Sequence, residues 1–183
     1  MKSVKFTAIA FAAILSAVAI PALAQVMVGG APMYSNKDIV DNAVNSKDHT
    51  TLVAAVKAAG LVPTLKGTGP FTVFAPTNAA FAALPAGTVD TLLKPENKPA
   101  LTKVLTYHVV AGKMDSAALI KAVDAGGGKA TLTEVSGGTL TVTKSGTLIM
   151  LSDESGGMAH VTIPDVVQSN GVIHVVDKVL LPK

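Results

Sequence analysis

The sequence predicts an α+β fold, and three observations support this class. Apolar residues recur at helical spacing in several short segments before residue 125. From Ala130 onward apolar and polar residues alternate, and glycine-containing turns separate the alternating segments. One earlier strand, Phe71–Ala75, lies among the helices and must join the later strands from a distance. Helices gathered early and hairpins gathered late are typical of α+β proteins and not of alternating α/β units.

Residues 1–24 are predicted to be a signal peptide outside the fold. Two lysines precede an uncharged, mostly apolar run over residues 6–20, and Ala22-Leu23-Ala24 has the small-x-small pattern that signal peptidase cleaves. An uncleaved anchor is the alternative, because the run approaches the length of a short membrane span. No later segment is apolar over such a length. We therefore expect an exported protein, periplasmic or extracellular, without a stable membrane span after cleavage.

Composition excludes several functional classes for the remaining 159 residues, which correspond to one domain. Two of the fifteen lysines leave with the signal peptide, so thirteen lysines and twelve acidic residues give a net charge of +1. The chain has no arginine and its lysines are scattered, which argues against nucleic acid as a partner. It also has no cysteine, which excludes thiol catalysis and thiolate metal sites.

The N-terminal part predicts a flexible leading segment and then two helices. Residues 25–34 contain Gly29-Gly30 and a proline, which indicates flexibility. A helix is expected to start at Ser35, with Asp38 at the acidic position of a capping box and an apolar face that extends to Val44. A second helix is expected over Thr51–Ala59, with Gly60 as its C-cap.

The segment after a glycine-rich turn predicts a buried strand that leads into a capped helix. Phe71–Ala75 is β-branched and aromatic, and Pro76 ends it. Thr77 is expected to cap the next helix by accepting a backbone hydrogen bond, and Asn78 belongs to the same structural motif.

Short helices broken by prolines are expected over the middle of the chain. Thr88 is predicted to cap a helix over Val89–Leu93. The next helix has apolar residues at helical spacing up to His108 and leads into an extended segment, Tyr107–Val110. A last helix is expected over Ser116–Val123, ended by three glycines.

The C-terminal third predicts a series of hairpins. Alternating segments begin near residues 132, 140, 148 and 160, each after a glycine-containing turn. Val166-Val167 and Val172–Val176, joined by Asn170-Gly171, carry the strongest hairpin signal. Pro164 and Asp165 are expected to break one strand before the next.

Three segments together resemble the fasciclin-like domain family: the run from Phe71 to Phe81, the pair Tyr107-His108, and the ending Asn170–Asp177. The resemblance covers about residues 35–182. It implies a single domain over residues 35–183, with a β-wedge of two sheets flanked by several small helices. It also implies an interaction or adhesion module with no shared chemistry.

The resemblance implies two candidate binding segments. In animal members a Tyr-His pair with aliphatic flanks is associated with adhesion, and Tyr107-His108 matches that pattern. Pro164-Asp165-Val166 is similar to a Pro-Asp-Ile segment used in family contacts, with Val166 in place of Ile. The alternative for His108 is a hydrogen-bonding residue that orders a turn. His174 alternates with Val172 and Val176 on one face of a strand and is expected to be a buried structural residue.

The sequence shows no recognisable catalytic or metal motif. The four histidines are widely spaced and form no H-E-x-x-H pattern, so no metal or other cofactor is predicted. No G-x-S-x-G elbow is present. The leading hypothesis is therefore an exported, non-enzymatic module that binds a protein or polysaccharide surface at the cell surface, in the periplasm or in the extracellular matrix. The alternatives are a carrier of a small apolar or glycan ligand in a crevice between sheet and helices, and a hydrolase with a non-standard site.

Overall fold

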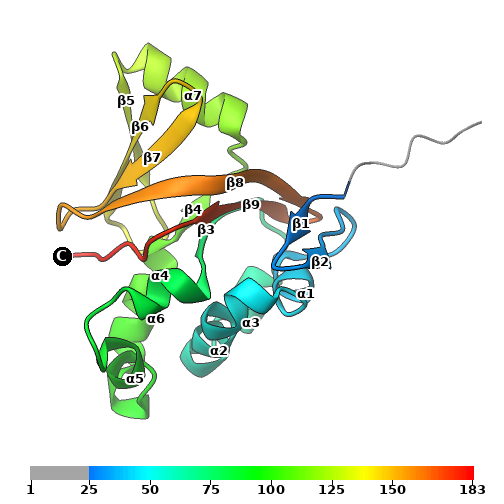
Figure 1. Cartoon of the computed structure of the whole chain (residues 1–183), viewed down its shortest axis with the longest axis vertical. Helices are drawn as coiled ribbons and strands as arrows, with labels where there is room; N and C mark the ends of the chain where they lie inside the picture. The colour runs from blue at the N-terminus through cyan, green and yellow to red at the C-terminus, as the bar shows by residue number, and fades with distance from the viewer. Residues whose placement is uncertain (1–24) are drawn as a thin grey trace, which may run out of the picture.

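A curled seven-stranded sheet with helices on two sides makes up residues 25–183, the part of the chain that this computed structural model describes (Figure 1). The predicted signal peptide, 1–24, lies outside the described residues. In spatial order the strands are β4 (Val109–Ala111), β3 (Phe71–Pro76), β9 (Gly171–Val176), β8 (Met158–Gln168), β7 (Leu148–Ser152), β6 (Thr139–Ser145) and β5 (Lys129–Thr133).

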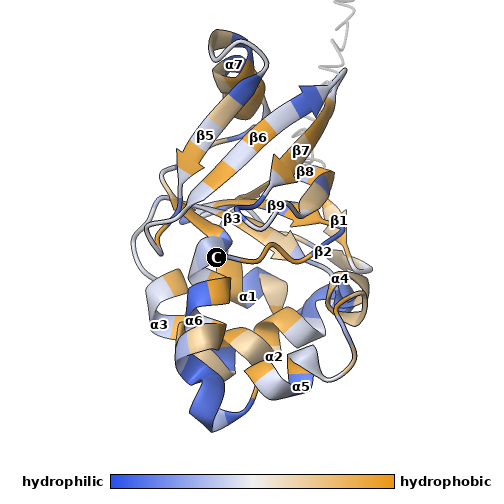
Figure 2. Ribbon diagram, turned by 90° about the vertical axis from the view of Figure 1, so that its left-hand side faces the viewer, coloured by the Kyte–Doolittle hydropathy of each residue, from blue (hydrophilic) through white to orange (hydrophobic). Residues whose placement is uncertain are grey.

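Helices cover the two sides of this sheet unequally. One group lies beneath β3 and β9, and α7 (Ser116–Ala125) packs against β5 and β6 at the opposite end of the molecule (Figure 2). The first group consists of α1 (Ile39–Ala43), α2 (Thr50–Ala59), α3 (Val62–Leu65), α4 (Asn78–Ala82), α5 (Thr88–Leu92) and α6 (Lys98–Tyr107). Two 3-10 turns, η1 (Lys47–His49) and η2 (Pro95–Asn97), connect them.

The two sheets of the wedge share the long strand β8. Its first three residues, 158–160, pair with β7, and residues 161–168 pair with β9. The wedge closes on its far side, where Val110 of β4 forms an isolated bridge to Glu134 and the Val135 N–H donates to the Val109 carbonyl at 2.8 Å. The α+β class and the predicted wedge flanked by small helices are confirmed.

Strand β3 is inserted between β4 and β9, as its apolar sequence requires. It pairs parallel with β9, Phe71 opposite Gly171 and Pro76 opposite Val176. A Cβ on Gly171 would lie 2.1 Å from the Phe71 carbonyl oxygen, so only glycine allows this approach. Both faces of β3 are buried because helices cover one face and the wedge covers the other.

The alternation along β3 and β9 separates two apolar cores. Val73, Ala75, Ile173 and Val175 point toward α1–α6 and belong to what we call the helix-side core. Phe74 and Val176 point the other way, into what we call the wedge core, together with Tyr107, Val110, Leu119, Val123, Leu132, Leu140, Val142, Ile149, Leu151, Ala159, Val161 and Leu180.

The N-terminal segment differs from the expectation of a flexible leader. Residues 27–32 form a small hairpin, β1 (Met27–Val28) and β2 (Ala31–Pro32), around Gly29-Gly30. Val28 and Met33 are buried in the helix-side core. The glycines make the turn, and the apolar residues beside them hold the segment on the domain.

Two helix starts were predicted at the wrong residue. The N-cap of α1 is Asp38 and not Ser35, because its carboxylate accepts the Asp41 N–H at 2.8 Å. Val44 lies past the end of this short helix and is 48% exposed. Gly87, in the left-handed conformation, precedes α5, so Thr88 is its first residue and not its cap.

Three further differences concern prolines and strand limits. Helix α3 was not predicted from the sequence, and its Pro63 lies in the first turn, where proline is tolerated. Tyr107 ends α6 and is not extended. Strand β8 continues through Pro164 and Asp165, with register shifts between Val161 and Val166, so these residues bend the strand and do not break it. The α2 helix and its left-handed C-cap Gly60 are confirmed.

Candidate functional site

Tyr107 and His108 lie at the junction of α6 and β4 and point into the protein. Their exposed fractions are 0% and 2%. The Tyr107 hydroxyl donates to the Thr139 carbonyl at 2.7 Å and accepts the Glu154 N–H at 3.1 Å. The pair therefore connects α6 to two turns of the wedge.

His108 joins α6 to the C-terminal segment through both ring nitrogens. Nδ1 lies 2.8 Å from the Val104 carbonyl, and Nε2 accepts the Leu180 N–H at 3.0 Å. The carbonyl requires a proton on Nδ1 and the amide requires a lone pair on Nε2, so the ring is neutral. Complete burial lowers the pKa of His108 to about 4, although the Val104 carbonyl and Asp153 favour the charged form.

Asp165 lies in the bend of β8 and holds the start of α7. It has φ 58° and is the one described residue other than glycine with a positive φ. One carboxylate oxygen accepts the Ser116 N–H at 2.6 Å and the other accepts the Ser116 hydroxyl. Asp115 caps the same helix by accepting the Ala118 N–H at 2.8 Å. Asp165 thus satisfies an amide of α7 from a distant strand. Val166, next to it, is fully buried.

His174 lies on the wedge face of β9, as predicted, and is fully buried. Its Nε2 lies 2.8 Å from the Met114 carbonyl, and its Nδ1 accepts the Asp165 N–H at 3.3 Å. The ring stacks on Phe74 at 5.6 Å between centroids. Burial lowers the pKa of His174, although the Met114 carbonyl and two nearby aspartates favour the charged form of the ring.

Ser116, Asp165 and His174 are close in space but are not arranged as a hydrolytic triad. The Ser116 hydroxyl donates to Asp165, and both nitrogens of His174 are engaged by the backbone. A triad requires the histidine to bond the serine hydroxyl. The contacts of this cluster support structural roles.

Thr77 and Asn78 hold helix ends together. The Thr77 hydroxyl accepts the Ala80 N–H at 3.2 Å, as predicted for the cap of α4. The Asn78 side chain accepts the Thr51 N–H at 3.0 Å and donates to the Lys47 carbonyl at 2.8 Å. It therefore connects α4 to the start of α2.

Sequence reasoning did not single out three buried polar residues. Asn170 accepts the Ile39 N–H at 3.1 Å and donates to the Leu65 carbonyl at 2.7 Å. Glu134 keeps one buried oxygen without a partner. His49 binds the Ser46 hydroxyl through Nδ1 at 2.8 Å, and its Nε2 has no hydrogen-bond partner. The partners of Asn170 are backbone atoms of distant segments, whereas His49 bonds Ser46 three residues earlier, a contact that no recognised motif marks.

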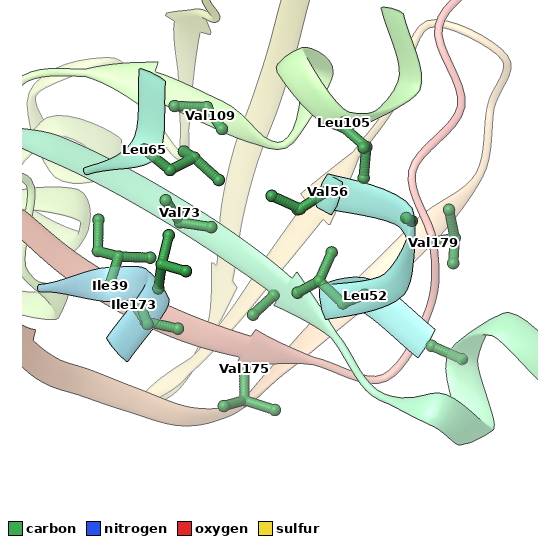
Figure 3. Packing of buried hydrophobic residues seen from close by; sticks show 14 of the residues in the cluster. Ile39, Leu52, Val56, Leu65, Val73, Leu105, Val109, Ile173, Val175 and Val179 are labelled. Carbon is green, nitrogen blue, oxygen red and sulfur yellow. The ribbon is translucent and has the colours of Figure 1, made fainter. Parts of the chain in front are cut away.

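An apolar cavity of about 60 Å³ lies between the helices and the sheet. Figure 3 shows the surrounding side chains: Val56 and Leu52 of α2 face Val73 of β3. His49 and His108 are also at its wall. Among residues 25–183, no cluster of three metal-binding side chains occurs and no helix is long and apolar enough to cross a membrane.

The family model described as the fasciclin domain matches residues 47–182. The chain belongs to the fasciclin domain family. This fasciclin domain is 49% identical over 157 residues to protein sll1483 of Synechocystis sp., covering 85% of this chain and 79% of that protein. It is 34% identical over 145 residues to the cell surface glycolipoprotein MPB83 of Mycobacterium bovis, covering 76% of this chain and 58% of that protein.

A solved structure confirms the fasciclin fold. The domain pair of the insect cell adhesion molecule fasciclin I superimposes with a TM-score of 0.70 at 18% sequence identity. The match covers 79% of this chain and 51% of that one, so the present chain spans about half of the solved pair. Fasciclin domains generally act as non-enzymatic adhesion modules.

Proposed function

We propose that the chain is an exported, non-enzymatic adhesion module that binds a protein or polysaccharide surface through the outer side of the β8 bend. The observation that favours the β8 bend as the binding surface is the left-handed backbone of Asp165. Strained conformations of this kind persist where the surrounding structure fixes them, and they concentrate at functional positions.

The bend presents a small apolar surface beside a fixed carboxylate. Pro164 is exposed and Val167 is 39% exposed, whereas Asp165 is half-buried and Val166 is inside. The contacts of Asp165 and Val166 hold the bend, and Pro164 and Val167 supply the contact surface. Adhesion through such a surface depends on shape complementarity and gains strength when several copies act together.

In this proposal Tyr107 and His108 support the recognition surface from inside the protein. With both side chains buried, direct contact with a partner would require the α6–β4 junction to open. Their part in binding therefore remains a prediction. Export to the periplasm or beyond is supported by the N-terminal pattern and by the cell-surface name of the MPB83 relative.

The test uses two surface variants of the purified protein beginning at residue 25. Val167→Lys places a charge on the proposed surface, and Leu148→Lys changes a residue of similar exposure, 43%, at the far end of β7. Envelope and matrix extracts are passed over the immobilised wild type, and retained components are identified and then measured against each variant. We expect Val167→Lys to reduce retention at least fivefold and Leu148→Lys to leave it unchanged.

Equal effects of the two substitutions, or no effect of Val167→Lys, would overturn the location on β8. Retention no greater than on blank support would overturn the adhesion function itself. The carrier alternative has one specific observation in its favour, the cavity beside His49, which is a separate site. Its apolar lining does not favour a glycan, which needs many polar partners.

A further inference from the structure

The cavity in the helix-side core has an almost entirely apolar wall. It is bounded by side chains from α1, α2, α3, β3 and β9, including Ile39, Val56, Leu65, Val73 and Ile173 (Figure 3). Its volume of about 60 Å³ corresponds to roughly four to six water-sized positions. An engineered apolar cavity of about 150 Å³ holds benzene, so the present one fits a smaller molecule.

Only one buried side-chain polar atom at this wall lacks a hydrogen-bond partner. Both nitrogens of His108 are hydrogen-bonded, and the Ser46 hydroxyl is bonded to Nδ1 of His49. Lys57 lines the cavity but is an exposed residue of α2. Nε2 of His49 is buried and unpartnered, on a side chain that is 3% exposed. The Ala75 carbonyl lies near His49 and favours its charged form, but no well-aligned hydrogen bond forms.

Water is a poor occupant of such a site. A buried water needs two to four polar partners, and this wall offers one. An ion is also a poor occupant, because burial lowers the pKa of His49 and keeps the ring neutral, so the wall supplies no compensating charge. A neutral aliphatic molecule with one hydrogen-bonding group fits both the shape and the polarity.

We propose that this cavity binds a small neutral aliphatic alcohol, or the hydroxyl-bearing end of a longer aliphatic chain, with the hydroxyl on Nε2 of His49. A hydroxyl suits either tautomer of His49, because it can accept from Nε2–H or donate to an unprotonated Nε2. The aliphatic part fills the space between α2 and β3. This site is independent of the proposed adhesion surface on β8.

The test compares ethanol with chloroethane, which has nearly the same shape but no hydroxyl. Both are titrated into the protein beginning at residue 25, with labelled isoleucine, leucine and valine methyl groups and labelled histidine rings. We expect saturable shifts at Ile39, Val56 and Ile173 and at the His49 ring, with methyls of the wedge core unchanged. We expect ethanol to bind about three- to tenfold tighter than chloroethane, the range that one neutral hydrogen bond provides.

Substitutions distinguish the contribution of the His49 hydrogen bond to binding from the contribution of the cavity volume. His49→Phe should equalise the two affinities, and His160→Phe, at a partly exposed histidine, should preserve the preference. If His49→Phe does not fold, Val56→Ile tests the cavity in the presence of His49 by filling it, with Val142→Ile in the wedge core as the matched control. Val56→Ile should weaken ethanol binding at least fivefold and Val142→Ile should not.

Three results would overturn the proposal. One is the absence of saturable shifts up to 50 mM, a concentration on the order of ten times a weak millimolar Kd. Another is equal shifts in both cores, which means unspecific partitioning. The third is equal affinity for the two probes in the wild type, which removes the role of His49 and with it the alcohol class.

Discussion

At the scale of single residues, His108 joins two segments within the motif that suggested recognition. It holds the last turn of α6 and the backbone of Leu180 at once. We expect His108→Ala to lower the free energy of unfolding by about 1–3 kcal/mol, because it leaves buried backbone groups unpaired. Urea unfolding measures this, and His160→Ala, which removes a partly exposed side-chain contact with Asp177, should cost less than about 1 kcal/mol.

The adhesion assay applied to the same His108→Ala protein tests its recognition role. Adhesion that is unchanged while the variant remains folded would show that the residue is structural only. Adhesion that is lost without a loss of stability would contradict the structural interpretation.

The neutral histidines predict a loss of stability in mild acid. The pKa of His108 is about 4 in the folded protein, below its usual 6.5, because burial penalises the charge. Between these two values the unfolded chain binds more protons, so stability is complete above pH 6.5 and falls as the pH decreases toward 4. The loss is about 3 kcal/mol for His108 alone, and His49 and His174 shift in the same direction.

Urea unfolding at pH 7.5, 6, 5 and 4.5 checks this dependence. His108→Gln should have a shallower slope, by up to one proton, than the wild type. A free energy of unfolding that is constant from pH 7.5 to 4.5 would contradict neutral burial of these rings.

At the scale of elements, the strand β3 and the helix α4 form the unit on which the fold depends most. Phe74→Ala should cost about 3–5 kcal/mol because the ring is fully buried in the wedge core. Thr77→Ala should cost about 1 kcal/mol through loss of the cap on Ala80. Thr88→Ala is the matched control, since Thr88 follows the N-cap of α5 and makes no cap bond, and it should change stability by less than about 0.5 kcal/mol.

Denaturant unfolding of the three variants distinguishes the roles. If Thr77→Ala and Thr88→Ala have the same effect, the cap geometry at Thr77 carries no stability. If Phe74→Ala is tolerated with less than about 1 kcal/mol, the central position of β3 is wrong.

The bend in β8 also acts at the scale of elements. It lets one strand serve two sheets, and it places the Asp165 carboxylate at the start of α7. The His174 ring lies directly beneath the bend. It stacks on Phe74 and accepts the Asp165 N–H. The surface proposed for adhesion is therefore fixed from inside by three elements.

At the scale of the whole molecule, export determines where any partner can be met. The pattern of residues 1–24 predicts cleavage after Ala24, so mass spectrometry of the exported protein should find Gln25, or its cyclised form, at the N-terminus. An envelope protein that retains Met1 would contradict cleavage and favour a membrane anchor.

Much of the fold follows from local sequence. The alternation after residue 130, the β-branched run at Phe71 and the cap at Thr77 each express a backbone preference that a few neighbours determine. The family resemblance came from the same segments, and the helix C-cap at Gly60 followed from the conformational freedom of glycine. The errors occurred near Ser35, Thr88 and Pro63, where residues one to three positions apart can each start a helix or a proline can lie in a first turn.

Only the tertiary structure decided which polar residues face inward and what they hold. His174 binds the Met114 carbonyl 60 positions away, and Asn170 joins residues more than a hundred positions away in sequence, so no spacing rule identifies these contacts. The cavity and the bend in β8 likewise depend on how distant elements pack. Secondary structure is set by interactions of close neighbours, which the sequence displays, whereas a site is set by contacts between distant segments, which exist only once the sheet has closed.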